Sequence, residues 1–334
     1  MKTIEHESGK LHVTGEAVYI DDMLVNEKLL VGHAFTSSVA FGKIKSFNLE
    51  EAQALPGVHA ILTHNDIPGP NQMGPVIHDE LVLAKDEVTF VGQAIFLIAA
   101  ETDEIARQAE KLIEIEMEAL EPILTIEDAK AKNSFLQPSR KIESGNIETG
   151  FADSKHVLEG SLKVGGQEQW YLETQVCLAI PGEGNEITAY SSTQHPSETQ
   201  ALIAEVLDRP KNEVEVQIRR MGGAFGGKET QANHTALWAC LLADKTKRPV
   251  KIRLFRDDDQ KMTGKRHRQL INYKVGFDDE GLITTYDVEL NCDGGAATDL
   301  TMAVLERSMM HAENAYFIPN HEKAIVFNRL VIWR

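Results

Sequence analysis

The stretch Met221-Gly-Gly-Ala-Phe-Gly-Gly-Lys-Glu229 decides how the fold of this chain is interpreted. It follows an alternating segment, residues 213–219, that predicts a β-strand, and it precedes a mostly apolar segment, 232–243, that predicts a buried helix. Because glycine lacks a Cβ, the loop between them can bring its main chain close to a ligand, and the helix start behind it favours an anion. The stretch therefore indicates a ligand cradle, with a tight structural turn as the alternative.

The spacing Gly222-x-x-x-x-Gly227-Lys228 approaches that of a nucleotide phosphate-binding loop. That motif continues with Ser or Thr, whose hydroxyl holds Mg²⁺. Glu229 stands there instead, and its carboxylate would repel phosphate groups. We therefore exclude a nucleoside triphosphate site, and Glu229 could also simply favour the start of the helix.

A second stretch, Gly165-Gly-Gln-Glu-Gln-Trp-Tyr-Leu-Glu173, places a glycine pair before an amide-rich and aromatic segment. The amide of Gln167 can donate and accept hydrogen bonds without a charge, which suits contact with a polar cofactor. Taken alone, a glutamine at such a position is more often a solvent-exposed structural residue.

Composition excludes several classes of function. The 334 residues carry a formal net charge of −17, so the surface should repel nucleic-acid phosphates and anionic lipid. The longest apolar run, residues 94–100, is too short to cross a bilayer, and the N-terminus lacks the apolar core of a signal peptide. The three cysteines include no Cys-x-x-Cys pair and are too few for an iron–sulfur cluster, so we expect small buried hydrophobic residues. These features predict a cytoplasmic chain with no nucleic-acid or membrane partner.

Residue periodicity predicts an α+β fold without regular βαβ alternation. Residues 102–118 begin as an amphipathic helix, and their end, 113–117, alternates like a strand. Ser197-Glu-Thr-Gln200 fits a capping box before an apolar run. Further strands are expected at 28–35, 87–100, 155–163, 174–180 and within 250–293, with a solvated loop at Asp257-Asp-Asp259. The polar segment 127–151 is typical of a linker between two domains.

Together with other segments, the two stretches resemble the molybdenum-binding subunit of the xanthine dehydrogenase family. The similarity runs in order from residue 9 to residue 320. It includes Thr14-Gly-Glu-Ala-Val-Tyr-Ile-Asp-Asp22, Val91-Gly-Gln93, Ser192-Thr-Gln194, Leu305-Glu-Arg-Ser308 and Asn314-Ala-Tyr-Phe-Ile-Pro319. The resemblance implies an N-terminal α/β-hammerhead domain at 1–128, a linker at 129–150, and the first part of a molybdopterin-binding α+β domain at 151–334.

The resemblance also implies roles for individual residues. Gln167 and Phe225, with Gly226, would contact the molybdenum centre of a molybdopterin cofactor, and Glu229 would bind the substrate. A glutamate at this position favours a purine over an aldehyde, because its carboxyl can hydrogen-bond purine nitrogens. The implied reaction is oxidation of hypoxanthine or xanthine to urate with oxygen from water. Electrons would leave through iron–sulfur clusters and FAD on other chains or domains.

The sequence departs from the family toward its end. The family continues with an Arg-Gly-Phe-Gly-Gly-Pro-Gln segment and later a Gly-x-Gly-Glu segment that carries the general base, and residues 320–334 do not match what normally follows. We therefore expect no catalytic base in this chain and no activity from it alone. A truncation, a frame shift or a split gene would each account for this end of the sequence. The alternatives are a non-catalytic truncated domain, or part of a hydroxylase for another N-heterocycle or an aldehyde.

Overall fold

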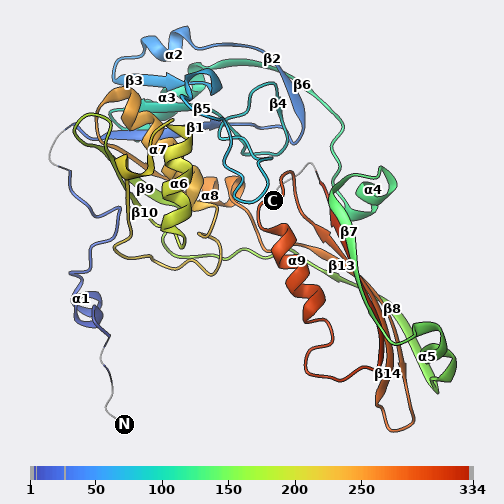
Figure 1. Ribbon diagram of the computed structural model, residues 1–334. Coiled ribbons are helices and arrows are strands. Elements are labelled where there is room, and N and C mark those ends of the chain that lie inside the picture. The colour runs from blue at the N-terminus through green and yellow to red at the C-terminus, as the bar shows by residue number, and fades with distance from the viewer. Residues whose placement is uncertain (1–3, 5, 26–27, 331–334) are drawn as a thin grey trace.

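A seven-stranded sheet joins the first third of the chain to its middle. The computed structural model describes residues 4, 6–25 and 28–330. Across the sheet the strands are β11 (Val214–Gln217), β10 (Ile187–Ser191), β9 (Val176–Pro181), β12 (Val250–Arg253), β1 (Leu30–Thr36), β5 (Ala94–Ala100) and β3 (Val58–Leu62). Strand β1 pairs in parallel with β12, with Leu30 opposite Val250. The two regions expected to form separate domains therefore share one sheet (Figure 1).

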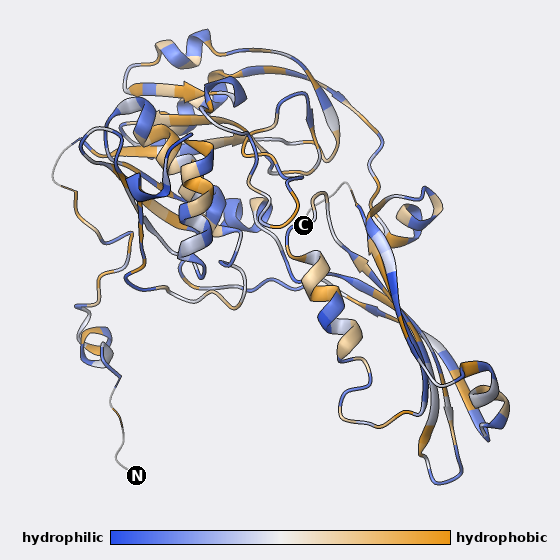
Figure 2. Cartoon of the chain, in the orientation of Figure 1, coloured by the Kyte–Doolittle hydropathy of each residue, from blue (hydrophilic) through white to orange (hydrophobic). Residues whose placement is uncertain are grey.

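Helices cover both faces of this sheet. Strand β5 is buried along its whole length: Leu97 and Ala99 face one core cluster, while Phe96 and Ile98 face another. The first cluster contains α6 (Pro196–Val206) and α7 (Ala232–Thr246), and the second contains α2 (Glu50–Ala54) and α3 (Asp103–Leu112). The hydropathy colouring shows hydrophobic residues concentrated in these strands and helices (Figure 2). This packing confirms the predicted buried helix, since residues 232–243 of α7 are all buried.

The hammerhead region adds a small sheet of three strands in the order β4 (Glu87–Val88), β2 (Gly42–Asn48) and β6 (Glu114–Ala119). The helix and strand predicted within 102–118 are confirmed as α3, whose first turn is capped by the Thr102 hydroxyl, and β6. The strand expected at 87–100 is instead two strands, β4 and β5. A turn separates them, in which Gly92 adopts a φ of +93° that favours glycine.

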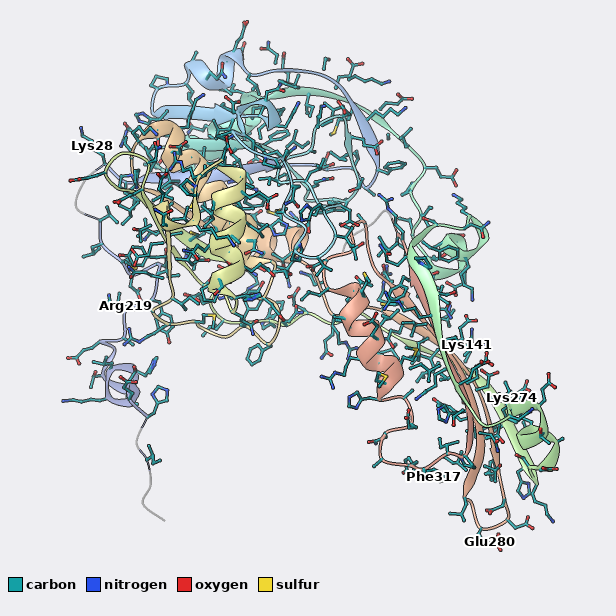
Figure 3. The ribbon with its side chains drawn as sticks, in the orientation of Figure 1. Lys28, Lys141, Arg219, Lys274, Glu280 and Phe317 are labelled. Carbon is teal, nitrogen blue, oxygen red and sulfur yellow. The ribbon has the colours of Figure 1, made fainter. Side chains whose placement is uncertain are left out.

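A separate five-stranded sheet forms an arm that extends from the seven-stranded sheet (Figure 1). Its order is β7 (Phe135–Ser144), β15 (Asn320–Asn328), β14 (Ile283–Asp293), β13 (Gln269–Phe277) and β8 (His156–Val164). Helix α9 (Thr301–Met310) packs on it through Leu305 and Met309. The side-chain view shows Lys274, Glu280 and Phe317 toward the far end of the arm (Figure 3).

The segment 129–150, expected to be a linker, is folded. It contains the end of α4 (Ile126–Ala131), all of β7 and the start of α5 (Ile147–Asp153). Strand β7 is an edge strand that pairs only with β15 in its sheet, and most of its side chains are exposed. Its polar composition reflects this exposed edge position and not an absence of structure.

Two local predictions are wrong. Helix α6 begins at Pro196, so Ser197 lies inside the helix and His195 occupies the capping position without a side-chain cap. Proline suits the first helical position because its φ is already helical and it has no amide to satisfy. Residues 257–259 are not a loop but the first turn of α8 (Arg256–Met262), where Asp259 is buried.

The remaining short elements are α1 (Gly9–Thr14) and the 3₁₀ turns His64–Asp66 and Lys211–Glu213. Among the helices of the described residues, none is both long enough and apolar enough to cross a membrane. The N-terminal segment that carries α1 extends away from the seven-stranded sheet (Figure 1).

Candidate functional site

The four residues proposed from the sequence line one cavity of about 440 Å³. Gln167 lies just beyond the end of β8, while Phe225, Gly226 and Glu229 belong to the loop between β11 and α7. The cavity thus lies between a segment that leaves the arm and a segment that enters the core helix. Its wall is completed by Gly227, Thr230, Gln231, Lys265, Arg266, His267 and Asp299, among others.

The glycine loop is tight on one side and open on the other. Cβ atoms placed at Gly222 and Gly227 would lie 2.5 Å from Glu173 Cβ and 2.6 Å from Tyr171 Cε1, so both glycines allow close packing. Gly226 has a φ of +89° and open space where a Cβ would be. The main chain at Gly226 is therefore accessible from the cavity, as a cradle requires.

Phe225 adopts the left-handed conformation, with a φ of +56°, and its side chain is 76% exposed. This conformation is uncommon for a residue with a Cβ and persists where the surroundings fix it. The fixing groups lie on both sides of the loop.

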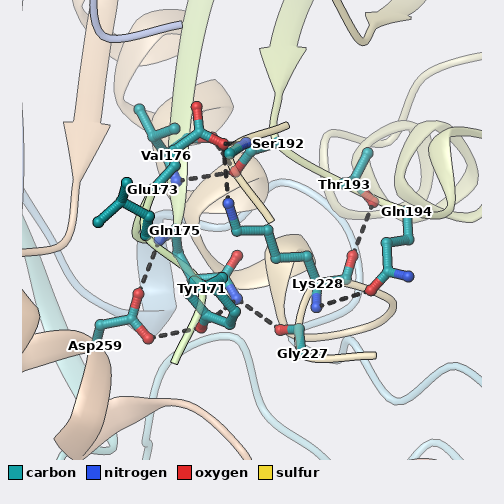
Figure 4. Close-up of polar contacts among 12 residues, drawn as sticks. Tyr171, Glu173, Gln175, Val176, Ser192, Thr193, Gln194, Gly227, Lys228 and Asp259 are labelled. Carbon is teal, nitrogen blue, oxygen red and sulfur yellow. Dashed lines mark hydrogen bonds and ion pairs between the residues drawn. The ribbon is translucent and has the colours of Figure 1, made fainter. Parts of the chain in front are cut away.

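Gln194 holds one side of the loop. Its Oε1 accepts a hydrogen bond from the backbone N–H of Gly226 at 3.1 Å. It also accepts one from the backbone N–H of Lys228 at 3.3 Å (Figure 4). Its own backbone N–H donates to the Lys228 carbonyl at 2.8 Å. The segment Ser192-Thr-Gln194, noted for its family resemblance, thus contacts the loop directly.

A buried polar network supports the other side (Figure 4). Gln175 Nε2 donates to the Gly227 carbonyl at 2.8 Å and to the Tyr171 hydroxyl at 3.0 Å. The Tyr171 hydroxyl donates to Asp259, whose other oxygen accepts the Gln175 backbone N–H at 2.8 Å. Burial, and then the nearby Asp259 carboxylate, raise the pKa of Tyr171, so its hydroxyl remains a donor.

Gln167 is fixed through its backbone. Its N–H donates to the Arg266 carbonyl at 3.2 Å, and its carbonyl accepts the Arg266 N–H at 3.0 Å. This isolated bridge joins the segment that follows β8 to the segment that precedes β13. The Gln167 side chain is exposed and lines both this cavity and a neighbouring one of about 590 Å³.

Two features of the site were not predicted from the sequence. Asp259 is the buried acceptor beneath the loop and not a solvated residue. The basic run Lys265-Arg-His-Arg268 lines the larger cavity, where Lys265 pairs with Glu168 at 2.9 Å and Arg268 donates to Asp293 at 2.7 Å. Four consecutive basic side chains in a chain of net charge −17 were the signal available in the sequence.

The residues present fit a polar cofactor. Gln169 lines the cavity, and its Oε1 is buried without a hydrogen-bond partner among the described residues. Such an atom is costly unless a bound group satisfies it. Together with the main chain at Gly226 and the uncharged amide of Gln167, it offers neutral hydrogen-bonding groups in a cavity whose wall also carries charged residues.

Comparison with known proteins identifies both parts of the chain. Residues 126–326 match the family model described as a molybdopterin cofactor-binding domain. Residues 14–121 match the a/b hammerhead domain of aldehyde oxidase and xanthine dehydrogenase. The chain is 44% identical over 317 residues to the xanthine dehydrogenase of Dictyostelium discoideum and 42% identical over 320 residues to the xanthine dehydrogenase/oxidase of Mus musculus. These matches cover 95% and 96% of the chain but only 23% and 24% of the relatives.

Solved structures show the same fold. The aldehyde oxidoreductase from Desulfovibrio gigas superposes with a TM-score of 0.91 over 98% of this chain and 38% of that chain, at 23% identity. Quinoline 2-oxidoreductase from Pseudomonas putida 86 gives a TM-score of 0.87 over 98% of this chain and 44% of that chain, at 22% identity. The chain therefore belongs to the aldehyde oxidase and xanthine dehydrogenase family, of which it carries the hammerhead domain and a molybdopterin cofactor-binding domain.

Proposed function

We propose that this chain forms part of the molybdenum site of a xanthine dehydrogenase-like hydroxylase that acts on purines. The observation that carries the proposal is the cavity in which Gln167 meets Phe225, Gly226 and Glu229. Two segments that lie far apart in the chain converge there, and each belongs to a stretch that resembles the family. A purely structural turn would not require Gln167 beside the loop.

The chain's own residues would bind the cofactor and orient the substrate. The amide of Gln167 and the main chain of Phe225 and Gly226 would hold the molybdopterin cofactor at its molybdenum end. When bound, the cofactor supplies the oxidative hydroxylation chemistry. The buried Oε1 of Gln169 would accept a hydrogen bond from a donor on the bound group. None of these contacts needs a charged side chain.

Glu229 is the proposed substrate-binding residue. The Glu229 side chain is exposed and lines the same cavity. The residue follows directly after Lys228, whose backbone is anchored by Gln194. A carboxylate can accept hydrogen bonds from purine N–H groups. The curated relatives at 41–44% identity, which are named xanthine dehydrogenase or xanthine dehydrogenase/oxidase, also favour a purine.

The chain spans about a quarter of the length of the curated relatives it matches. We therefore propose that it works with other chains or domains that supply iron–sulfur clusters, FAD and the rest of the molybdopterin site, in the cytoplasm. On this proposal the isolated chain does not turn over purines, and Glu229 is not a general base.

The test uses the chain produced with its neighbouring gene products in a host that makes molybdopterin. Copurifying chains, molybdenum and pterin per chain are measured, followed by turnover of xanthine, hypoxanthine, an aldehyde and a non-purine N-heterocycle. We expect molybdenum in the complex, turnover of purines, and a raised KM for xanthine in Glu229→Gln. Turnover of xanthine by the chain alone would refute the proposed dependence on partners. A preference for the aldehyde would refute the purine assignment, and a complex without molybdenum would favour a non-catalytic domain.

A further inference from the structure

One carboxylate oxygen closes the glycine loop. Glu173 Oε2 accepts the backbone N–H of Gly222 at 2.9 Å and the ammonium of Lys228 at 2.9 Å, so it joins the two ends of the loop. The backbone N–H of Glu173 also donates to the Gly222 carbonyl at 3.1 Å. Among the described residues, the second carboxylate oxygen, Oε1, is buried without a partner. Glu173 is therefore committed to the loop.

Lys228 is unusual because its side chain is fully buried. Its Nζ lies 4.8 Å from the centre of the Tyr171 ring, within the range of a cation–π contact. Burial lowers the pKa of Lys228, and the attraction of Glu173 opposes that effect. A buried ion pair stabilises a fold little better than apolar side chains of the same shape, so stability alone does not account for Lys228 here.

The ion pair between Glu173 and Lys228, called the clasp below, fixes the part of the loop that faces the cavity. Lys228 is held at its side chain by Glu173 and at its backbone by Gln194, and Gln194 also binds Gly226. Phe225 lies between the two anchored ends, and Glu229 follows the second. A shift of Lys228 would therefore change the direction in which Glu229 leaves the loop.

We propose that Lys228 and Glu173 are positioning residues: their ion pair holds the loop in the one conformation that presents Phe225, Gly226 and Glu229 to the cavity. This inference rests on the proposed function, because the loop conformation matters to the reaction only if the loop lines the molybdopterin site. Neither residue lines the cavity, so both act through the loop.

The experiment compares the full chain with Lys228→Met, Glu173→Gln and the double variant. Methionine keeps the length of the side chain against Tyr171, and glutamine keeps an oxygen for Gly222. We expect the double variant to regain the thermal midpoint of the wild type, because neither partner is left as an unpaired buried charge. Amide hydrogen exchange at Gly226 and Lys228 should remain at least about tenfold faster than in the wild type, because the clasp is still missing.

Lys245→Met is the matched control. It removes another lysine ion pair, with Asp66, from the exposed end of α7, and it should leave exchange in the loop unchanged. Wild-type exchange at Gly226 and Lys228 in the double variant would overturn the proposal, and so would an increase spread evenly over the whole chain. Amide exchange needs no cofactor, and therefore the molybdenum content of the wild-type complex tests the proposed function separately.

Discussion

The hydroxyl of Tyr171 donates a 2.7 Å hydrogen bond to the carboxylate of Asp259, and both groups are buried beneath the glycine loop. The partners lie in different elements, since Tyr171 precedes β9 and Asp259 belongs to α8. The Thr263 hydroxyl donates to the same Asp259 oxygen at 3.1 Å. This contact links the stretch 165–173 to helix α8, which the sequence did not associate with the site.

Tyr171→Phe removes the hydroxyl and keeps the ring that packs against Gly227 and Lys228. Asp259 then loses a donor in a buried position, and the free energy of unfolding should fall by about 1–3 kcal/mol. Urea denaturation followed by circular dichroism measures the change. Tyr316→Phe is the control, because the Tyr316 side chain is 67% exposed and its substitution should have little effect. Equal midpoints for wild type and Tyr171→Phe would show that the buried hydrogen bond contributes nothing net.

Gly227→Ala tests the close packing under the loop. The new Cβ would lie 2.6 Å from Tyr171 Cε1, so the ring or the loop must move, and overpacking of this kind costs about 1–3 kcal/mol. Gly165→Ala is the control, because its Cβ would meet no atom within 4 Å. Thermal unfolding of the two variants should show a lower midpoint for Gly227→Ala only. A similar loss in both would mean that backbone flexibility, and not contact with Tyr171, determines the effect.

The sequence predicts the local elements well where one periodicity dominates. The buried helix at 232–243 and the helix followed by a strand within 102–118 are both present. Their apolar spacing depends on neighbours within a few turns, so it is visible without knowledge of the tertiary structure. The strand β7 was missed because an exposed edge strand does not need apolar residues.

The candidate site was predicted as a set of residues but not as a structure. Gln167 and the glycine loop could be chosen from residue chemistry and family resemblance. The buried support, Asp259 and the Glu173–Lys228 pair, could not, because it depends on which side chains the fold brings together. Asp259 lies in a run of three aspartates, and nothing in that run distinguishes the buried member from its neighbours.

The three cysteines provide a test of the core. Cys177 and Cys240 are completely buried, and burial raises the pKa of each thiol. Burial raises the pKa of Cys292 in the same way. Because the thiolate is the reactive form, none of the three should react with a thiol reagent in the native chain at neutral pH. Titration with a chromogenic disulfide should detect all three thiols only after unfolding in guanidinium, and rapid reaction of one native thiol would contradict this packing.

Asp244 makes stability depend on pH in a direction that can be derived. Burial acts to raise the pKa of its carboxyl, but hydrogen bonds from Lys247 and Arg209 outweigh burial and lower the pKa below 3.8. A lowered folded-state pKa contributes stability above the unfolded-state value, and that contribution is lost as the pH falls through the folded-state pKa. Asp244→Asn should therefore be less stable than wild type at pH 7, by about 1–3 kcal/mol for a charge-assisted hydrogen bond.

The difference should begin to narrow as the pH falls past 3.8, where the unfolded chain takes up the proton, and should close once the pH is below the lowered folded-state pKa, because the folded carboxyl is then protonated and resembles the amide. Urea denaturation at a series of pH values between neutral and acidic measures this convergence. Asp279→Asn is the control, because Asp279 also pairs with a lysine, Lys155, but its side chain is 61% exposed, and exposed pairs contribute little. A difference between wild type and Asp244→Asn that stays constant across the series would show that packing of the side chain, and not its charge, stabilises the end of α7.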